Sequence, residues 1–331
     1  MKYRIAIAGS TNNTVSMAKA LAKDDRFEIT WTLSPTPKTV GRKKELIQNP
    51  LHVWSQENKI KTFLVEQKIN RSLLKEFEQN GEIDFLLVVD FGYFIPNWLL
   101  KLPKIAPLNI HPSLLPKWRG SSPGQFCILF QDLDQNSLES AITLMIMNSS
   151  LDQGPILTQL PFTLKQNWTQ NEYYQAAFAL IKEKLADLIN DFANKKIQPI
   201  IQPDNSPTMV ARRLSKEDSF VSWTNLLRLM NEQQKTKIEE TEENNPGLLT
   251  DLLNNQNICE NKSKQITLIK NASLAFSPWP NLWTIIPTTN GEKRMKILAC
   301  HKENEVLILD QVQIEGKNLC TWNECKNILK S

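Results

Sequence analysis

The stretch Pro107-Leu-Asn-Ile-His-Pro-Ser-Leu-Leu-Pro-Lys-Trp-Arg-Gly120 decides the fold of this chain. Its first residues form an expected strand, in which Asn109 and His111 occupy alternate positions and therefore leave the same face. Pro112 and Pro116 fix φ at two points and exclude a continuing helix, so the residues between them form a stiff loop. The stretch thus predicts a polar strand end beside a rigid loop that can hold a ligand.

Short apolar runs alternate with longer amphipathic runs around this stretch. We expect strands at residues 3–8, 27–33, 61–65, 85–89, 108–111 and 141–147, and helices at residues 14–23, 43–58, 70–79 and 170–193. The alternation predicts an α/β fold, with a Rossmann-like, mostly parallel sheet covered by helices on both faces. Ligands of such sheets bind beyond the carboxyl ends of the strands. The turn at Gly9 has too few glycines for a dinucleotide fingerprint, so we expect no nicotinamide cofactor.

The composition excludes several classes of protein. A chain of 331 residues that is 41% hydrophobic and 22% charged has an ordinary globular balance. It shows neither a signal peptide nor an apolar run long enough to span a membrane, so we expect a cytoplasmic protein. The five cysteines lack a Cys-x-x-Cys pair, which favours reduced thiols and no metal. The net charge of +4 is too small to indicate nucleic-acid binding by itself.

A carboxylate follows the strand and loop later in the chain. Asp152 precedes Gln153-Gly154, a turn signal that favours a short acidic side chain and a glycine at positive φ. We expect Asp152 to orient the His111 ring. His111 could carry the proton that an attacking amine loses, and Asn109 could donate to a developing oxyanion, which is worth roughly 3 to 4 kcal/mol. These residues favour direct acyl transfer to an amine, because no Ser or Cys here is paired with a base.

Two strings of residues resemble a known family. Asn-Ile-His-Pro-Ser-Leu-Leu-Pro at 109–116 with Arg119-Gly120, and Asp-x-Gly-Pro-Ile-Leu at 152–157, resemble the formyltransferases that use 10-formyltetrahydrofolate. A longer resemblance, to the methionyl-tRNA formyltransferases, includes residues 4–10, 84–96, 214–223 and 276–280. It implies transfer of a formyl group from 10-formyltetrahydrofolate to the α-amine of methionyl-initiator tRNA.

The resemblance also assigns roles to residues of this sequence. It makes Asn109, His111 and Asp152 the catalytic set. It implies folate contacts from Ser113, Leu114, Leu115 and Pro116, and a pterin pocket formed by Phe91, Gly92, Ile95, Asn148 and Leu151. The basic segment with Lys38, Arg42, Lys43 and Lys44 resembles the loop that contacts the tRNA acceptor stem, and side chains of this kind can reach phosphates.

The chain divides into two expected domains. Residues 1–196 form the catalytic domain, and three prolines in residues 197–211 indicate an extended linker. In residues 212–331 we expect a short helical entry, then from Lys264 a small β domain, which the resemblance makes a barrel of the oligonucleotide-binding type that binds tRNA. Residues 231–263, rich in Glu, Asn and Gln, predict a solvated and partly disordered insertion. Four tryptophans, Trp223, Trp279, Trp283 and Trp322, are expected in the core.

Two alternatives remain open at this point. The same first domain serves formyltransferases that act on nucleotide-linked amino sugars, although the basic segment at residues 38–44 argues against that substrate. A non-catalytic folate-binding or RNA-binding relative is the other, although intact Asn109, His111 and Asp152 argue against loss of activity. The expected partners are initiator methionyl-tRNA and folate, with no membrane partner, and we expect a monomer.

Overall fold

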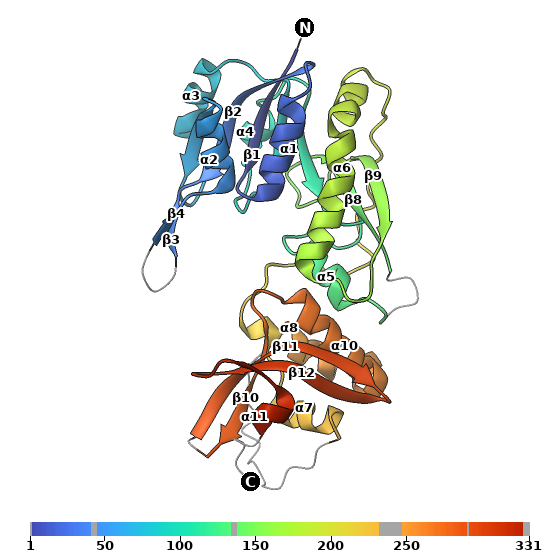
Figure 1. Ribbon diagram of the computed structural model, residues 1–331. Coiled ribbons are helices and arrows are strands. Elements are labelled where there is room, and N and C mark those ends of the chain that lie inside the picture. Colours follow the sequence, from blue (N-terminus) through green and yellow to red (C-terminus); the bar gives the residue numbers. More distant parts are fainter. Residues whose placement is uncertain (1, 41–44, 134–137, 232–246, 290, 327–331) are drawn as a thin grey trace. The chain divides into compact units, whose positions relative to one another are not determined.

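The computed structural model describes residues 2–40, 45–133, 138–231, 247–289 and 291–326 (Figure 1). The chain forms two compact units, each described by itself below. Unit 1 comprises residues 1–123, 140–162 and 174–211, and unit 2 comprises residues 124–139, 163–173 and 212–331. The predicted domain boundaries at 196 and 211 stay a prediction, although the last break between the units falls after Ala211. None of the helices among the described residues has the length and apolarity needed to cross a membrane.

A seven-stranded sheet forms the centre of unit 1, in the order β5-β2-β1-β6-β7-β8-β9. The strands are β1 (Tyr3–Gly9), β2 (Phe27–Pro35), β5 (Lys61–Val65), β6 (Phe85–Val89), β7 (Ala106–His111), β8 (Glu139–Ile146) and β9 (Ile156–Thr163). The pairs from β5 to β7 are parallel, and β8 runs antiparallel to β7. The prediction of a mostly parallel sheet is therefore confirmed. Strand β9 was not predicted, because Pro161 interrupts its pattern, and it lies at an edge where proline is tolerated.

Helices cover both faces of this sheet because its strands are apolar on both sides. Ile5 and Ile7 of β1 pack with side chains of α1 (Asn12–Ala22), α2 (Pro50–Glu57) and α6 (Gln170–Ala193). Ala6 and Ala8 point the other way and pack with side chains of α3 (Leu74–Gln79) and α4 (Asn97–Leu100). This alternation follows the period of two in a strand. Figure 1 shows the short α5 (Pro123–Leu129), which follows the loop after β7.

The helix predicted at residues 43–58 is wrong at its start. Residues 38–40 and 45–47 form the antiparallel strands β3 (Lys38–Val40) and β4 (Glu45–Ile47), and α2 begins only at Pro50. Proline lacks an N–H and disfavours a helical residue before it, so it suits the first helical position and sets the boundary there. The helix predicted at residues 70–79 is divided into a 3₁₀ turn (Arg71–Leu73) and α3.

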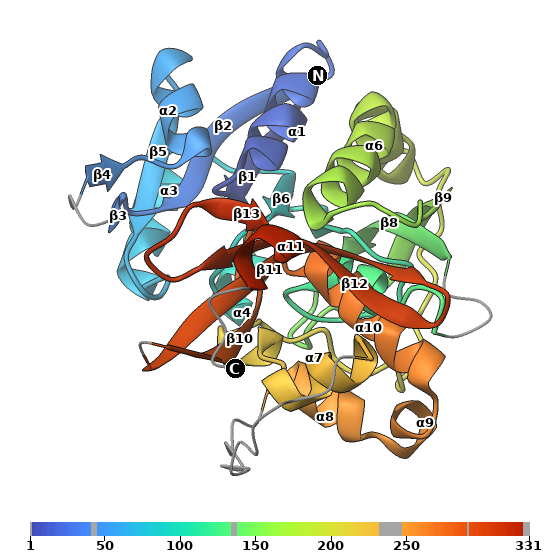
Figure 2. The same cartoon turned by 60° about the horizontal axis from the view of Figure 1, so that its bottom comes forward.

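Unit 2 combines helices with a four-stranded antiparallel sheet, shown in Figure 2. The sheet has the order β10 (Leu282–Thr288), β11 (Gly291–Glu303), β12 (Val306–Ile314) and β13 (Leu319–Thr321), as expected for a small barrel. The helices are α7 (Trp223–Leu229), α8 (Leu248–Asn254), α9 (Gln256–Cys259), α10 (Lys262–Ala275) and α11 (Trp322–Cys325), with a 3₁₀ turn at Glu217–Ser219. The predicted short helical entry is thus confirmed.

Two expectations for the second half of the chain were wrong, namely the start of the β domain and the burial of Trp279. The predicted solvated, partly disordered insertion contains helices at residues 248–254 and 256–259, where the leucine pairs Leu248-Leu249 and Leu252-Leu253 recur one turn apart and are buried. Residues 232–246 lie outside the described residues. The β domain starts later than Lys264, since α10 runs to Ala275. Trp279 is 50% exposed, whereas the other three tryptophans are buried.

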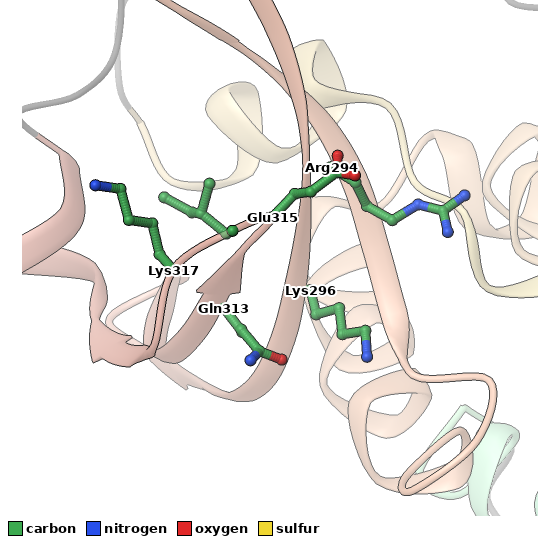
Figure 3. Close-up of a pocket in the computed structure, with 7 residues that line it drawn as sticks. Arg294, Lys296, Gln313, Glu315 and Lys317 are labelled. Atoms are coloured by element: carbon green, nitrogen blue, oxygen red, sulfur yellow. The ribbon is translucent and has the colours of Figure 1, made fainter. Parts of the chain in front are cut away.

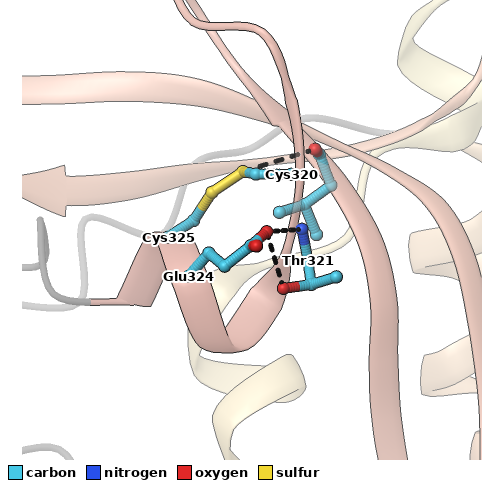
Figure 4. The surroundings of a disulfide bond; sticks show 5 residues. Cys320, Thr321, Glu324 and Cys325 are labelled. Carbon is cyan, nitrogen blue, oxygen red and sulfur yellow. Dashed lines mark hydrogen bonds between the residues drawn. A yellow bond between two sulfur atoms is a disulfide. The ribbon is translucent and has the colours of Figure 1, made fainter.

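Cys320 and Cys325 form a disulfide, so the expectation of five reduced thiols is wrong for these two (Figure 4). Cys320 lies in β13 and Cys325 ends α11, which begins directly after that strand. The carboxylate of Glu324 accepts hydrogen bonds from the backbone N–H and hydroxyl of Thr321, at 2.9 Å each. This capping box turns the chain back on itself and brings the two cysteines together. Cys259 and Cys300 are free thiols.

A buried carboxylate ties the segments of unit 2 together. Asp218 accepts hydrogen bonds from the Arg212 guanidinium at 2.5 and 2.7 Å, and from the backbone N–H groups of Ser215 and Leu248 at 2.7 and 3.1 Å. Burial alone would raise the pKa of Asp218, but these donors prevail and lower it from 3.8 to about 2.

We therefore expect Asp218→Asn to destabilise the protein by about 2 kcal/mol at neutral pH, since one pKa unit corresponds to about 1.4 kcal/mol. The folded-state pKa lies below the unfolded value, so this stability is present above pH 3.8 and is lost as the pH falls toward about 2. Urea unfolding at several pH values measures it. If the difference in the free energy of unfolding between wild type and Asp218→Asn stays constant across that acid range, the charge of Asp218 has no such role.

Candidate active site

A cavity of about 530 Å³ opens at the carboxyl ends of the central strands of unit 1. Its walls come from the turn after β1, the segment after β6, the end of β7 and the turn at residues 151–152. The lining residues that the chemistry uses are Ser10, Thr11, Asn13, Asp90, Asn109, His111, Asp152 and Tyr174. This is where a parallel sheet binds ligands. Gly9 is needed at the first turn, because a Cβ there would meet the Val89 carbonyl oxygen at 2.4 Å.

His111 ends strand β7 and has its side chain 5% exposed. Its Nε2 lies 3.1 Å from the carbonyl oxygen of Trp118. Because a carbonyl oxygen can only accept, Nε2 carries a proton and donates it to this bond. Its Nδ1 lies 3.7 Å from Oδ1 of Asp152, within ion-pair distance. An imidazolium, which has an N–H at both ring nitrogens, matches these two acceptors.

Asp152 is held in place by the motif that follows β7. Its Oδ2 accepts a hydrogen bond of 2.8 Å from the backbone N–H of Gly120, which leaves Oδ1 toward His111. The turn differs from the prediction, because Asp152 itself has a positive φ of 51°. Gly154 is required for space instead, since a Cβ there would lie 1.8 Å from the Ile146 carbonyl oxygen.

The predicted linker supports the Asp152 turn. The side-chain amide of Gln202 donates to the carbonyl oxygens of Asp152 and Gly154 at 3.0 and 2.7 Å. The buried Arg119 guanidinium donates to the Gln202 side chain at 3.0 Å and to the Pro203 carbonyl oxygen at 2.7 Å. Arg119 therefore fastens residues 202–203 behind the site. Composition alone had indicated only an extended linker here, because such side-chain bonds leave no local pattern.

Asn109 lies two residues before His111 on the same strand face, and both line the cavity, as predicted. Its register partners are Val88 on β6 and Met145 on β8. Within the described part of the chain, no group hydrogen-bonds the Asn109 side chain. Its N–H₂ group is therefore available to a ligand in the cavity. The structure thus brings Asn109, His111 and Asp152 to one space.

A second cavity, of about 310 Å³, adjoins the first and shares Phe91, Asn109, Leu151 and Asp152 with it. It is mostly apolar, with Ile95, Met145 and Met147 among its lining residues. The residues predicted to form the pterin pocket line these two cavities. Phe91, Ile95, Asn148 and Leu151 line the second, and Gly92 lines the first.

Residues 113–116, the predicted folate contacts, lie behind the cavities rather than in their walls. Ser113 and Leu115 are 0% and 2% exposed, and none of residues 113–116 lines either cavity. The Ser113 hydroxyl donates to the Lys117 carbonyl oxygen at 2.7 Å, and Leu115 packs on Met145 and Ile156. These residues stiffen the loop behind the site, and sequence spacing could not distinguish that role from ligand contact.

Asp90 is a polar residue of the site that the sequence did not single out. It follows β6 directly, and its Oδ2 accepts hydrogen bonds from the Thr11 hydroxyl at 2.8 Å and the Asn13 amide at 2.9 Å. Burial raises the pKa of the Asp90 carboxyl, although the bonds from Asn13 and Thr11 and the nearby His111 oppose that shift. An acidic residue at the end of the apolar run at 85–89 was the available signal.

The predicted tRNA-binding residues are only partly described. Lys38 lies at the start of β3, whereas Arg42, Lys43 and Lys44 lie outside the described residues. Unit 2 has its own basic pocket of about 230 Å³ on its sheet (Figure 3), lined by Arg294, Lys296, Gln313, Ile314, Glu315, Gly316 and Lys317. The Arg294 guanidinium lies 3.9 Å from the centre of the Trp283 ring, a cation–π contact that holds it in place.

Comparison with known proteins agrees with this geometry. The family model described as Formyl transferase matches residues 1–187. A methionyl-tRNA formyltransferase of Clostridium novyi is 31% identical over 240 residues, 69% of this chain and 74% of that protein. One of Ehrlichia chaffeensis is 28% identical over 326 residues, which cover 97% of this chain and 95% of that one.

Solved structures show the same fold at low identity. A methionyl-tRNA formyltransferase from Clostridium thermocellum superposes with a TM-score of 0.51 at 14% identity, over 94% of this chain and 98% of that chain. A sugar 3N-formyl transferase has a TM-score of 0.56 at 17% identity, over 92% and 88% of the two chains. The sequence relatives, rather than these fold matches, identify the family. The chain belongs to the formyl transferase family, and its sequence relatives are methionyl-tRNA formyltransferases.

Proposed function

We propose that the protein transfers the formyl group of 10-formyltetrahydrofolate to the α-amino group of methionyl-initiator tRNA, giving formylmethionyl-tRNA for translation initiation. The observation that carries the proposal is the convergence of Asn109, His111 and Asp152 on one cavity in a chain of this family. The reaction uses charged tRNA and a reduced folate, which implies a cytoplasmic location. No metal is needed for it.

The proposed reaction is a direct acyl transfer. The free amine attacks the formyl carbon, and negative charge develops on the formyl oxygen. The Asn109 amide and the Nδ1–H of a protonated His111 donate to that oxyanion, which places donors where charge develops. His111 passes a proton to the folate nitrogen as the C–N bond breaks and takes the attacking nitrogen's proton in its place, directly or through a water held by Asp152, and tetrahydrofolate leaves. The carboxylate of Asp152, fixed by Gly120, stabilises the imidazolium.

The adjoining cavity of about 310 Å³ is the proposed place of the pterin. Its apolar walls suit a flat heteroaromatic ring, and polar groups at residues 148–150 lie at its rim. Because Asn109 and Asp152 line both cavities, a formyl group carried by a ligand in the second would reach the polar side chains of the first.

The proposed tRNA contacts come from two places. The segment at residues 38–44 has four cations in the sequence, and the basic pocket of unit 2 offers Arg294, Lys296 and Lys317 against one carboxylate, that of Glu315. Phosphate contacts of this kind give affinity that falls as salt rises.

Formyl transfer measured with purified protein, 10-formyltetrahydrofolate and different acceptors tests the proposed function. We expect rapid formylation of methionyl-initiator tRNA and far slower formylation of a nucleotide-linked amino sugar. A reversed preference would favour the sugar-nucleotide alternative, and activity on neither acceptor would favour a non-catalytic relative.

Removing charge from the basic pocket should weaken tRNA binding. We expect Lys296→Ala with Lys317→Ala to raise the dissociation constant of tRNA several-fold and to lower the dependence of log affinity on log salt by about one per lost phosphate contact. Filter binding over a salt series measures both quantities. The exposed Lys184→Ala on α6 is the control, and a double variant that binds like this control would remove the pocket from the tRNA surface.

A further inference from the structure

Asp90 and His111 lie at the carboxyl ends of neighbouring strands. Strands β6 and β7 pair in parallel, and His111 is the last residue of β7. Asp90 is the first residue after β6, where its positive φ of 47° turns the chain out of the strand. Both side chains line the cavity of about 530 Å³. The sheet therefore presents a second carboxylate to the space in which Asn109 and His111 act.

The Asp90 carboxylate is fixed and keeps one oxygen for a ligand. Oδ2 takes both hydrogen bonds, from Thr11 and Asn13, while the Ser10 hydroxyl donates to the Asp90 carbonyl oxygen at 3.1 Å. No group in the described ranges hydrogen-bonds Oδ1 of Asp90. Neither lysine nor arginine is among the described residues that line this cavity. A cationic ligand would therefore meet a carboxylate that has no basic side chain as its counter-ion in the cavity.

The acceptor supplies a cation of the right kind. An α-amino group has an ordinary pKa near 8, so at neutral pH most of it arrives as ammonium, which cannot attack a carbonyl carbon. Burial raises the pKa of Asp90, which makes this carboxylate a better base than an exposed one. A carboxylate that attracts the ammonium and accepts its proton would therefore both bind the acceptor and convert it to the nucleophilic amine.

We propose that Asp90 binds the acceptor's α-ammonium group through Oδ1 and takes its first proton, a role that rests on the proposed function. The N–H bond of the ammonium breaks, the proton forms a carboxylic acid on Asp90, and the electron pair stays on nitrogen. That pair then attacks the formyl carbon. The second proton leaves after attack through His111, reaches the folate nitrogen as the C–N bond breaks, and Asp90 releases its proton to water.

Binding without the formyl donor isolates this role from turnover. The ligands are methionyl-initiator tRNA and the matched tRNA whose α-amino group is replaced by a hydroxyl group. We expect Asp90→Asn to raise the dissociation constant of the amine ligand about tenfold and to leave that of the hydroxyl ligand unchanged. The asparagine oxygen can still accept from Thr11, so the fold is kept. The exposed Asp25→Asn is the control for a lost negative charge, and equal changes for both ligands would overturn the proposal.

The pH dependence gives a second readout. Asp90 must be ionised to hold the ammonium, so the preference of the wild-type protein for the amine ligand falls on acidification. The other titratable groups that line the cavity are His111, Asp152 and Tyr174, and Asp90→Asn retains all three. We expect wild type and Asp90→Asn to have the same dissociation constant for the amine ligand at low pH. A difference in this constant that does not change with pH would contradict ionisation of Asp90 as its cause.

Turnover separates failure of this inference from failure of the proposed function. We expect Asp90→Asn to raise the KM for charged tRNA and lower kcat, with the KM for 10-formyltetrahydrofolate unchanged. If the wild-type protein formylates tRNA while Asp90→Asn matches it in these constants, only the Asp90 proposal fails. If the wild-type protein formylates no tRNA, the proposed function itself fails. A raised KM for the folate alone would assign Asp90 to the donor and overturn the proposal.

Discussion

His111→Ala should lower kcat for formyl transfer by about a hundredfold to ten-thousandfold, the range typical of a lost general acid–base group. The variant removes the donor to the oxyanion and the path for the amine's proton together. The loss should fall on kcat with little change in the KM of either substrate, because His111 contributes to the transition state rather than to binding. Steady-state kinetics with both substrates varied measures it.

A matched control comes from the other histidines of the chain. His301 is exposed and pairs with Asp310 at 2.9 Å in unit 2, so His301→Ala should keep wild-type kcat. Thermal unfolding of both variants tells apart a lost fold and a lost reaction. If His111→Ala keeps a near-normal kcat, His111 has no part in the chemistry.

Asp152→Asn should lower kcat by about a hundredfold or more while leaving the fold intact. Asparagine retains an oxygen that can accept from the Gly120 N–H, so the turn keeps its anchor. It loses the negative charge 3.7 Å from Nδ1 of His111, and with it the stabilisation of the imidazolium. The same kinetic assay measures this loss.

The exposed Asp204→Asn is the control for this substitution, since Asp204 contributes only its backbone oxygen to Arg119. If Asp152→Asn keeps the wild-type kcat, then Asp152 only shapes the turn.

The sequence predicted the parts of this structure that local pattern controls. Residues 5–8 are all apolar, and an amphipathic helical pattern follows them, which predicts a strand buried on both faces. The structure confirms this, because side chains from this strand lie in the cores on both sides of the sheet. Asn109 and His111 could be placed on one face because the period of a strand is two. The turn signal at Asp152 and the resemblance both pointed to this residue, whereas its distance to His111 depends on the folded turn.

Other features depend on contacts that no local pattern carries. Asp90 has the pattern of an ordinary residue after a strand, and only the folded sheet brings it to the cavity that His111 lines. Arg119 was only part of the motif in the sequence, whereas in the structure its guanidinium is buried against Gln202. The start of α2 was placed too early because the basic segment before Pro50 has helix-forming residues, while the proline sets the boundary.

A double-mutant cycle on His111 and Asp152, measured as the single-turnover rate of formyl transfer to methionyl-initiator tRNA, tests most directly whether these side chains act as one unit. If Asp152 works through His111, then Asp152→Asn should cost little once His111→Ala is present, so the double variant should be about as slow as His111→Ala alone. Rate losses that multiply, with each substitution keeping its full effect in the presence of the other, would contradict the account.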